Sequence, residues 1–506
     1  MVKYFCLLIC ISLMLSLNFI VNETYGFSRR NIVKREENIN GEPNITQFLN
    51  DHDDTITSTS SNLTSNESSI EVETMEHDID TSTVMVIYAL RHGNRNPSKY
   101  FENNPLKRGW GEEGPLELNR RGKNEVFNFG VRLRHFLNGF IRRNFNGSEV
   151  NLYTSSANRC QMTLQLVSAA VFRPIGYGSW RDNLDWSPTP YNIVDDLLRP
   201  YAKNCDAIKA AWEPIEKEVI PEIQEQVKSN QDIIKFFERE GGIFKFDSTR
   251  PYNELANIAD NFHNYQIYRK PFPDFVTNVN FSNYNQTNLV EKVLTFIEGP
   301  QIACANDKKC GYLMGGNWLS HIKNELLKKA NKTNNYPVKM IGYSSHTEIL
   351  LSTMKLMGID QNEVRTGCGF IIQLREKPFW SLKILKHNTI YQNNKLTGHS
   401  ITIANYSKPL KKISMNNGWI DLKNFTNFIQ NNTIDDWEEI CPTCTSKVKD
   451  IMPPKISDSK ISGDSFNPKY DRLNTTDNNS SVKIYSPYNV FLLISFAIIS
   501  VICKIL

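Results

Sequence analysis

The chain has 506 residues, with 58 Lys plus Arg against 54 Asp plus Glu and a formal net charge of +4 at pH 7. This charge is small for the length, and the sequence has neither a basic block nor a basic-aromatic stripe, so we expect no nucleic-acid partner. The length allows one large domain or two interlocked ones between the terminal segments.

The N-terminal region has the pattern of an exported protein. Residues 3–21 are a lysine followed by an apolar run, which predicts a secretory signal peptide over residues 1–26, cleaved near Tyr25-Gly26. A first transmembrane helix is the alternative, but the terminal position and the polar sequence behind the run favour the signal peptide. Residues 27–81 are rich in Asn, Ser, Thr, Glu and Asp, so we expect a disordered leader.

The other end of the chain predicts a membrane anchor. The tail, residues 489–506, is apolar from Val490 to Cys503 and follows a polar linker, residues 448–488. It fits either a short spanning helix or a GPI-anchor signal, with the folded part in a lysosome, at the cell surface or secreted after cleavage. Acceptor sequons behind the signal peptide predict a glycoprotein. They begin at Asn44, Asn62, Asn66, Asn146, Asn280, Asn285, Asn331, Asn405, Asn424, Asn431 and Asn474.

The cysteines of the mature region are odd in number, so at least one is free or pairs between chains. They are Cys160, Cys205, Cys304, Cys310, Cys368, Cys441 and Cys444. The spacing of Cys304 and Cys310 allows a small disulfide loop. The pair Cys441 and Cys444 has the CxxC spacing of thioredoxins, but it lacks a second pair for zinc and a preceding strand. A structural disulfide therefore suits this segment better.

The first chemistry-bearing segment is an apolar strand, residues 84–90, followed by RHGNRNP. A helix comes later, over residues 119–141, with one buried face. The residues of that face are Val126, Phe129, Leu133, Phe136 and Phe140.

Two further segments repeat the order of strand, polar turn and helix. Residues 150–153 predict a strand, and Ser155 or Ser156 would cap a helix that begins near Asn158. Residues 340–343 predict another strand. There Ser344 or Ser345 would cap a helix over residues 347–357, which Gly358 would end.

These patterns predict an α/β fold in which a central mixed, mostly parallel sheet is flanked by helices. Residues 82–174 and 336–447 would form this core. The stretch between them, residues 175–335, has charged helical patterns and Asn-rich loops, so we expect an inserted, mainly helical cap.

The three strand ends carry cations. In an open α/β sheet, ligands bind beyond the carboxyl ends of the strands, so these side chains would meet in one crevice. Guanidinium groups with paired planar donors suit phosphate, and the starts of the two following helices would add backbone donors. The residues are Arg91, His92, Arg95, Arg159 and His346.

The segment RHGNRNP resembles the RHGxRxP signature of the histidine acid phosphatases, branch 2 of the histidine phosphatase superfamily. Further blocks in matching order are LNRRGKNEVFNFGVRLR, TSSANRCQMTLQLVSAAVF, WSPTPYNIVDDLLRPYAKNC, YSSHTEILLSTMKLMGI and IDDWEEIC. The resemblance is greatest to the prostatic, lysosomal and insect venom enzymes. It implies a phosphoglycerate mutase-like core, hydrolysis of phosphate monoesters without metal or cofactor, a Cys205–Cys441 disulfide and a homodimer.

The resemblance also implies individual roles. His92 would form a phosphohistidine intermediate, while Arg91, Arg95, Arg159 and His346 would hold the phosphate oxygens. The family's proton donor is an Asp directly after the second histidine, and here that position is Thr347.

Glu348 follows one residue later, as in the His-Ala-Glu arrangement of inositol polyphosphate phosphatases, so we expect it to donate the proton. The alternative is a weakened or inactive relative that acts as a phospholigand- or partner-binding membrane protein. The natural substrate is not specified by these motifs.

Overall fold

The structure is a computed structural model of the chain, and it describes residues 78–101, 113–240, 246–279, 281, 284–331, 335–392 and 395–442. The predicted signal peptide, almost all of the leader, the linker and the hydrophobic tail lie outside the described residues. Within the described ranges, no helix is both long and apolar enough to cross a bilayer.

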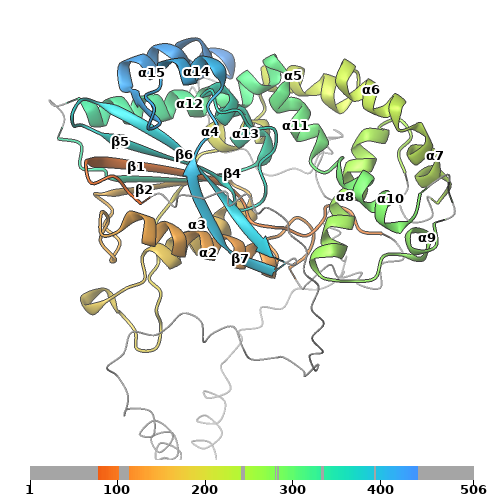
Figure 1. Cartoon of the computed structure of the whole chain (residues 1–506), viewed down its shortest axis with the longest axis horizontal. Coiled ribbons are helices and arrows are strands. Elements are labelled where there is room, and N and C mark those ends of the chain that lie inside the picture. The colour runs from red at the N-terminus through yellow and green to blue at the C-terminus, as the bar shows by residue number, and fades with distance from the viewer. Residues whose placement is uncertain are drawn as a thin grey trace, which may run out of the picture. The chain divides into compact units, whose positions relative to one another are not determined.

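The described strands form one mixed sheet with the order β3-β2-β4-β1-β5-β6-β7, and β8 pairs with β6 (Figure 1). The predicted mixed α/β sheet is thus confirmed. Fewer pairings are parallel than predicted: three of the described pairings are parallel and four are antiparallel. The strands are β1 (Thr83–Arg91), β2 (Val150–Thr154), β3 (Asn192–Ile193), β4 (Met340–Ser345), β5 (Gly369–Arg375), β6 (Ser381–Gln392), β7 (Lys395–Ile403) and β8 (Trp419–Asp421).

The short turns between successive strands explain why so many of the pairings are antiparallel. Strands β5, β6 and β7 follow one another through short turns, and such turns join only antiparallel neighbours. The parallel pairings all lie among β1, β2, β3 and β4, and three of these strands carry the predicted site residues at their carboxyl ends.

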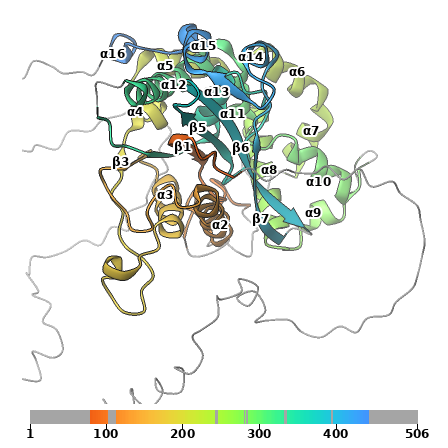
Figure 2. The same cartoon turned by 60° about the vertical axis from the view of Figure 1, so that its left-hand side comes forward.

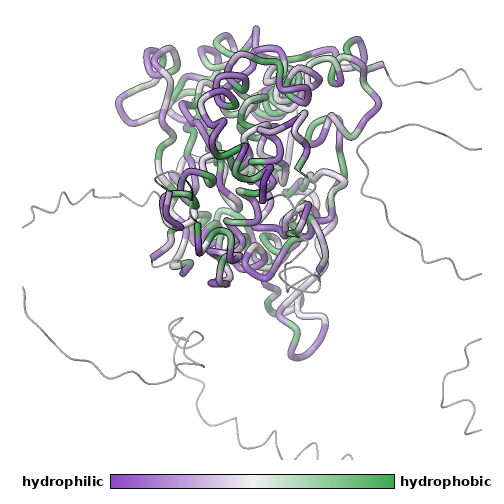
Figure 3. The backbone as a smooth tube through the Cα atoms, turned by 90° about the vertical axis from the view of Figure 1, so that its right-hand side faces the viewer, coloured by the Kyte–Doolittle hydropathy of each residue, from purple (hydrophilic) through white to green (hydrophobic). Residues whose placement is uncertain are grey.

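Strand β1 lies between β4 and β5 and is buried on both faces. Its side chains alternate: Ile87 and Ala89 belong to one apolar cluster, and Val86 and Tyr88 belong to the other. A strand covered on both faces has a continuous apolar sequence. Figure 3 shows the hydrophobic stretches gathered toward the middle of the folded part.

Helices cover both faces of the sheet (Figures 1 and 2). One face carries α2 (Arg120–Leu137) and α3 (Asn158–Val171). Of the predicted apolar face, Val126, Phe129, Leu133 and Phe136 are buried on α2, whereas Phe140 lies beyond the end of the helix and is partly buried. The opposite face is covered by a larger set. These helices are α4 (Asp195–Leu198), α5 (Asp206–Glu216), α11 (Gly299–Asn306), α12 (Lys308–Ala330), α13 (Thr347–Leu356), α14 (Lys408–Ile413) and α15 (Leu422–Ile429), with α16 (Trp437–Ile440) near the end of the described chain.

A separate apolar cluster belongs to helices that lie to one side of the sheet (Figure 1). It includes Phe236, Phe237 and Phe262 together with Phe101 from the segment after RHGNRNP. The boundaries of the predicted cap, residues 175–335, stay a prediction. The helices on this side are α6 (Pro221–Ser229), α7 (Gln231–Arg239), α8 (Pro251–Ile267), α9 (Asp274–Thr277) and α10 (Gln286–Leu294).

The predicted serine caps are wrong. Ala157 precedes α3 and His346 precedes α13, and neither side chain caps its helix. The serines hydrogen bond elsewhere: the Ser345 hydroxyl donates to the Leu198 carbonyl over 2.9 Å, and the Ser155 hydroxyl contacts His346. The predicted stop at Gly358 is confirmed by its φ of 83° just after α13.

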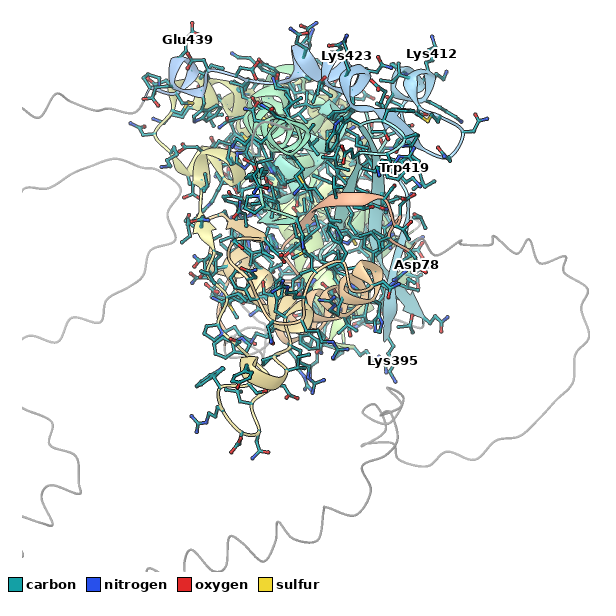
Figure 4. All side chains as sticks on the ribbon, turned by 90° about the vertical axis from the view of Figure 1, so that its left-hand side faces the viewer. Asp78, Lys395, Lys412, Trp419, Lys423 and Glu439 are labelled. Carbon is teal, nitrogen blue, oxygen red and sulfur yellow. A yellow bond between two sulfur atoms is a disulfide. The ribbon has the colours of Figure 1, made fainter. Side chains whose placement is uncertain are left out.

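The antiparallel side of the molecule ends in a polar surface. Lys412 on α14 and Lys423 on α15 project outward (Figure 4), whereas Trp419 on β8 is buried. The Arg375 guanidinium lies 3.9 Å from the centre of the Trp419 ring, which closes this edge of the core.

Candidate active site

The signature loop begins where β1 ends, and neighbouring strands hold it there. The Arg91 N–H donates to the Cys368 carbonyl over 2.9 Å, and the His92 N–H donates to the Ser345 carbonyl over 3.0 Å. The end of β1 is therefore tied to the end of β4 and to the residue before β5. This fixes the two histidines at the carboxyl ends of adjacent parallel strands.

The loop also packs against the first turn of α2 without intervening side chains. A Cβ on Gly93 would clash with the Gly122 carbonyl, and a Cβ on Gly122 would clash with the backbone of Asn94. The Asn119 amide donates to the Asn94 side-chain oxygen over 2.5 Å, and the Asn119 side-chain oxygen accepts from the Gly122 N–H. The loop and the start of α2 are thus one packed unit.

His92 is almost completely buried, and its tautomer is fixed. Its Nδ1 lies 2.9 Å from the Gly93 carbonyl, which only accepts, so Nδ1 carries the proton. The lone pair is then on Nε2. Burial, with the nearby charges of Arg159 and Arg91, holds the pKa of His92 well below its ordinary value. The imidazole therefore stays neutral in mildly acidic solution.

His346 precedes α13 and lies beside His92, with 5.6 Å between the ring centres. Its Nδ1 lies 3.2 Å from a terminal nitrogen of Arg159, on α3, and its Nε2 lies 3.0 Å from the Ser155 hydroxyl. Arginine only donates, so Nδ1 accepts and Nε2 donates to Ser155. Both ring nitrogens of His346 are thus engaged by protein groups.

Arg91 and Arg95 are paired with carboxylates. An Arg91 terminal nitrogen lies 2.6 Å from Glu298 Oε1, and one of Arg95 lies 2.7 Å from Asp260 Oδ2. A second Arg95 nitrogen lies 3.6 Å from Glu298 Oε1. Neither carboxylate was predicted from the sequence. Glu298 directly precedes α11, and Asp260 lies on α8.

Glu298 reaches the arginines from an unusual backbone position, with a φ of 55°. Its Oε2 accepts a hydrogen bond from the Thr347 hydroxyl over 2.9 Å. Burial alone would raise the pKa of Glu298, but Arg91 and Arg95 together lower it below its ordinary value. The carboxylate is therefore ionised and held between two arginines and the residue at the family's proton-donor position.

Glu348 has a different environment although it follows Thr347. It is buried, and its carboxyl group lies close to the Tyr201 hydroxyl. Burial raises the pKa of Glu348 above the ordinary value of 4.5. A carboxyl group with a raised pKa stays protonated at higher pH, which suits a general acid.

The structure thus brings together the five cations and histidines predicted from strand ends, and it places Glu348 next to them. Arg199 was missed: its charge acts on His346, and its terminal nitrogen donates to the Ser156 hydroxyl over 3.2 Å. Within the described ranges, Arg159 and Arg199 form no salt bridge. Their Nε atoms are buried and have no hydrogen-bond partner in that part of the chain.

Two disulfides flank the site. Cys205 pairs with Cys441, as the family resemblance implied, so the partner of Cys441 is not Cys444, which lies outside the described residues. Cys304 pairs with Cys310 and joins α11 to α12. Among the described residues, Cys160 and Cys368 are buried free thiols. The described part of the chain holds no cluster of three or more His, Cys, Asp or Glu residues suited to a metal ion.

The fold is a mixed α/β sheet, and the site gathers cationic side chains around two histidines at the ends of its parallel strands. The family model for the histidine phosphatase superfamily (branch 2) matches residues 84–370, more than half of the chain. The chain therefore belongs to this superfamily.

Curated relatives include two from Bos taurus. Its prostatic acid phosphatase is 24% identical over 267 residues, which cover 52% of this chain and 65% of the relative. Its lysosomal acid phosphatase is 23% identical over 279 residues, which cover 54% of this chain and 62% of the relative. The matched region therefore spans just under two thirds of these relatives.

Solved structures with a similar fold are phytases. That of a Klebsiella species has a TM-score of 0.51 at 11% identity, covering 74% of this chain and 100% of the phytase. The Hafnia alvei phytase in complex with myo-inositol hexakis sulphate has a TM-score of 0.50 at 12% identity, covering 71% and 99%. At this identity the likeness concerns the fold.

Proposed function

We propose that this protein hydrolyses phosphate monoesters through a phosphohistidine intermediate on His92. The observation that carries the proposal is the placement of His92: its Nδ1 proton is bound by the Gly93 carbonyl, which leaves Nε2 as the nucleophile. The charges of Arg91 and Arg159 act on the same ring. Membership of the superfamily and the names of the acid phosphatase relatives support the same chemistry.

In the first step, His92 Nε2 attacks phosphorus and the bond from phosphorus to the ester oxygen breaks. Arg91, Arg95 and Arg159 stabilise the charge on the three remaining oxygens. The carboxyl group of Glu348 gives its proton to the departing ester oxygen, so the alcohol leaves neutral.

In the second step, a water molecule attacks the phosphohistidine. The Glu348 carboxylate now accepts a proton from this water, the bond from phosphorus to Nε2 breaks, and inorganic phosphate forms. Glu348 is protonated again and His92 is neutral, so one cycle consumes one ester and one water. The arginines supply the positive charge, and the proposal includes no metal or cofactor.

His346 acts in this scheme mainly by orienting Arg159. Its Nδ1 accepts from Arg159, and its Nε2 is held by Ser155. This differs from the expectation that His346 holds a phosphate oxygen directly.

The cellular setting also belongs to the proposal. The relatives named prostatic and lysosomal acid phosphatases support a secretory-pathway location. The lumenal or extracellular orientation, the glycans, the membrane tail and the homodimer stay predictions. Phosphate monoesters are the proposed substrate class.

A non-hydrolysing phospholigand-binding protein is the second candidate function. The observation that favours it is Thr347 at the position of the family's acid, with its hydroxyl bonded to Glu298. Such a protein would bind phosphate but would release none from phosphate esters.

Release of phosphate from p-nitrophenyl phosphate at about pH 5 separates the two functions. We expect wild-type protein to turn over and His92→Ala to lose at least about 10⁴-fold in kcat. His135→Ala, which removes an exposed histidine on α2, is the matched control and retains wild-type activity. Equal background release by wild type and His92→Ala, with phosphate binding intact, would leave the non-hydrolysing function.

A further inference from the structure

A carboxylate already occupies donors that a phosphate group needs. Glu298 Oε1 lies 2.6 Å from an Arg91 nitrogen and 3.6 Å from an Arg95 nitrogen. The other Arg91 terminal nitrogen donates to the Val364 carbonyl over 2.9 Å. Both terminal nitrogens of Arg91 are therefore engaged, and an incoming oxyanion meets an arginine that is already bound.

Both oxygens of the Glu298 carboxylate are bound by other side chains. Its second oxygen, Oε2, accepts from the Thr347 hydroxyl, and only 13% of the Glu298 side chain is exposed. Such charge-assisted hydrogen bonds in a buried site are stronger than neutral ones. A phosphate group from solution would therefore compete for these arginines with a carboxylate that the protein already holds in place.

We propose that Glu298 competes with the phosphate group for Arg91 and Arg95, so that ligand binding displaces its carboxylate from these arginines. This inference rests on the proposed function, because it takes the candidate site to bind phosphate. Glu298 then sets the affinity of the site for phosphate, and Thr347 holds the Glu298 carboxylate in place.

The competition has a pH dependence with a definite sign. In the free protein, Arg91 and Arg95 outweigh burial and lower the pKa of Glu298. A displaced carboxylate loses these cations and gains a neighbouring dianion, so its pKa rises and it takes up a proton. Ligand affinity therefore increases as the pH falls. The charged and titratable groups that surround Glu298 are Arg91, Arg95, Arg159, Asp260, His263 and Glu348.

Calorimetric titration of inorganic phosphate into wild type, Glu298→Gln and Glu213→Gln tests the proposal. Glutamine keeps the shape of the side chain but removes the charge. We expect about 10-fold or greater tightening in Glu298→Gln, the factor for one charge-assisted hydrogen bond that no longer has to be broken. The control, Glu213→Gln, alters an exposed pair with Lys217 and should bind like wild type. Unchanged or weaker binding by folded Glu298→Gln overturns the proposal.

Sulfate separates the titration of Glu298 from that of the ligand, because sulfate keeps its double charge between about pH 5 and about pH 8. Wild type should bind sulfate more tightly at the lower pH, and Glu298→Gln should lose part of this difference. The histidines contribute the remainder in both proteins. An identical pH dependence in the two proteins overturns the proposal.

A crystal structure of the wild type with phosphate gives a measurement that needs no variant. We expect the phosphate oxygens on Arg91 and the Glu298 carboxylate moved away from it. A carboxylate still hydrogen bonded to Arg91 beside bound phosphate overturns the competition. Because these measurements follow binding, they leave the proposed hydrolysis to stand or fall on the His92→Ala experiment.

Discussion

The two sides of the candidate site contain the same kind of cation in opposite electrostatic states. On the carboxylate side, Arg91 and Arg95 are paired with Glu298 and Asp260. On the His346 side, Arg159 and Arg199 have no salt bridge within the described residues and lie around His346. The difference teaches that strand ends place Arg91, Arg95 and Arg159, whereas distant segments decide which of these arginines are neutralised.

A disulfide bond lies near each side of the site. The Cys205–Cys441 disulfide follows the segment that carries Arg199 and Tyr201, and it links that segment to the end of α16. The Cys304–Cys310 disulfide lies at the end of α11, the helix that begins directly after Glu298. The sequence distance that each bond closes differs greatly, at 236 and 6 residues.

The largest effect expected from this comparison of the two sides concerns the proton donor on the His346 side. Glu348→Gln should lower kcat by about 10² to 10⁴-fold for an alkyl phosphate, whose leaving oxygen needs a proton. The loss should be smaller for p-nitrophenyl phosphate, because p-nitrophenolate leaves without protonation. Initial rates on both substrates give the comparison, and equal losses would contradict the assignment of Glu348.

The same variant tests the pH dependence. Burial raises the pKa of Glu348 above 4.5, so the acid form persists to higher pH and kcat falls as the pH rises through that pKa. Burial also lowers the pKa of His92, which keeps the nucleophile neutral at lower pH than an ordinary histidine. Glu348→Gln should lose the basic limb of the kcat profile and keep the acidic limb.

Alanine substitution of one arginine on each side should show which side affects activity and which affects stability. Arg159→Ala should lower kcat by about 10² to 10³-fold, as for one oxyanion donor, with little change in the free energy of unfolding. Arg95→Ala should lower the free energy of unfolding by about 3 kcal/mol at neutral pH, because it leaves buried Asp260 without its partner.

Urea denaturation at two pH values completes this test. Burial raises the pKa of Asp260 more than Arg95 lowers it, and removal of Arg95 raises it further. Protonated Asp260 needs no cation, so the stability loss in Arg95→Ala should shrink in acid and grow as the pH rises. If Arg95→Ala and Arg159→Ala lower the free energy of unfolding by the same amount, the two sides of the site do not differ in this respect.

Removal of the two disulfides should lower the stability of the protein by different amounts. Replacing Cys205 and Cys441 with serine should cost about 5 kcal/mol, because the bond closes a loop of 236 residues. Replacing Cys304 and Cys310 should cost about 2 kcal/mol for their six-residue separation. Thermal unfolding of the two double variants measures the order, and the reverse order would contradict loop-closure entropy as the cause.

The smallest expected effect concerns the hydroxyl that holds Glu298. Thr347→Val removes one hydrogen bond from the carboxylate, so phosphate should bind about threefold more tightly. Thr353→Val on the same helix is the control, since its hydroxyl bonds the Ile349 carbonyl. Weaker phosphate binding in Thr347→Val would indicate that Thr347 contacts the ligand itself.

Sequence patterns predicted what is encoded locally. Arg91 ends a short apolar strand, and His92, Arg159 and His346 each follow one; parallel strands bring these ends to one edge. The serine caps failed because a capping residue and a site residue have the same polar character, and the structure uses Ser155 to hold His346.

The partners of these residues could not be predicted in the same way. Glu298 and Asp260 lie more than 160 positions from the arginines they contact, in helical segments without the pattern of strand and turn. A signal did exist for Glu298, since Gly299-Pro300 marks a sharp helix start. It gives no information about where the preceding side chain points.

The glycine contact between the signature loop and α2 restricts how the candidate site can change shape. Gly93 and Gly122 leave no gap between the loop and the first turn of the helix. A hinge within the loop would have to carry an 18-residue helix with it. The wall that carries Glu298 and Asp260 contacts this segment through side-chain ion pairs, Arg95–Asp260 and Lys99–Glu254, and we expect any change in the shape of the site to occur there.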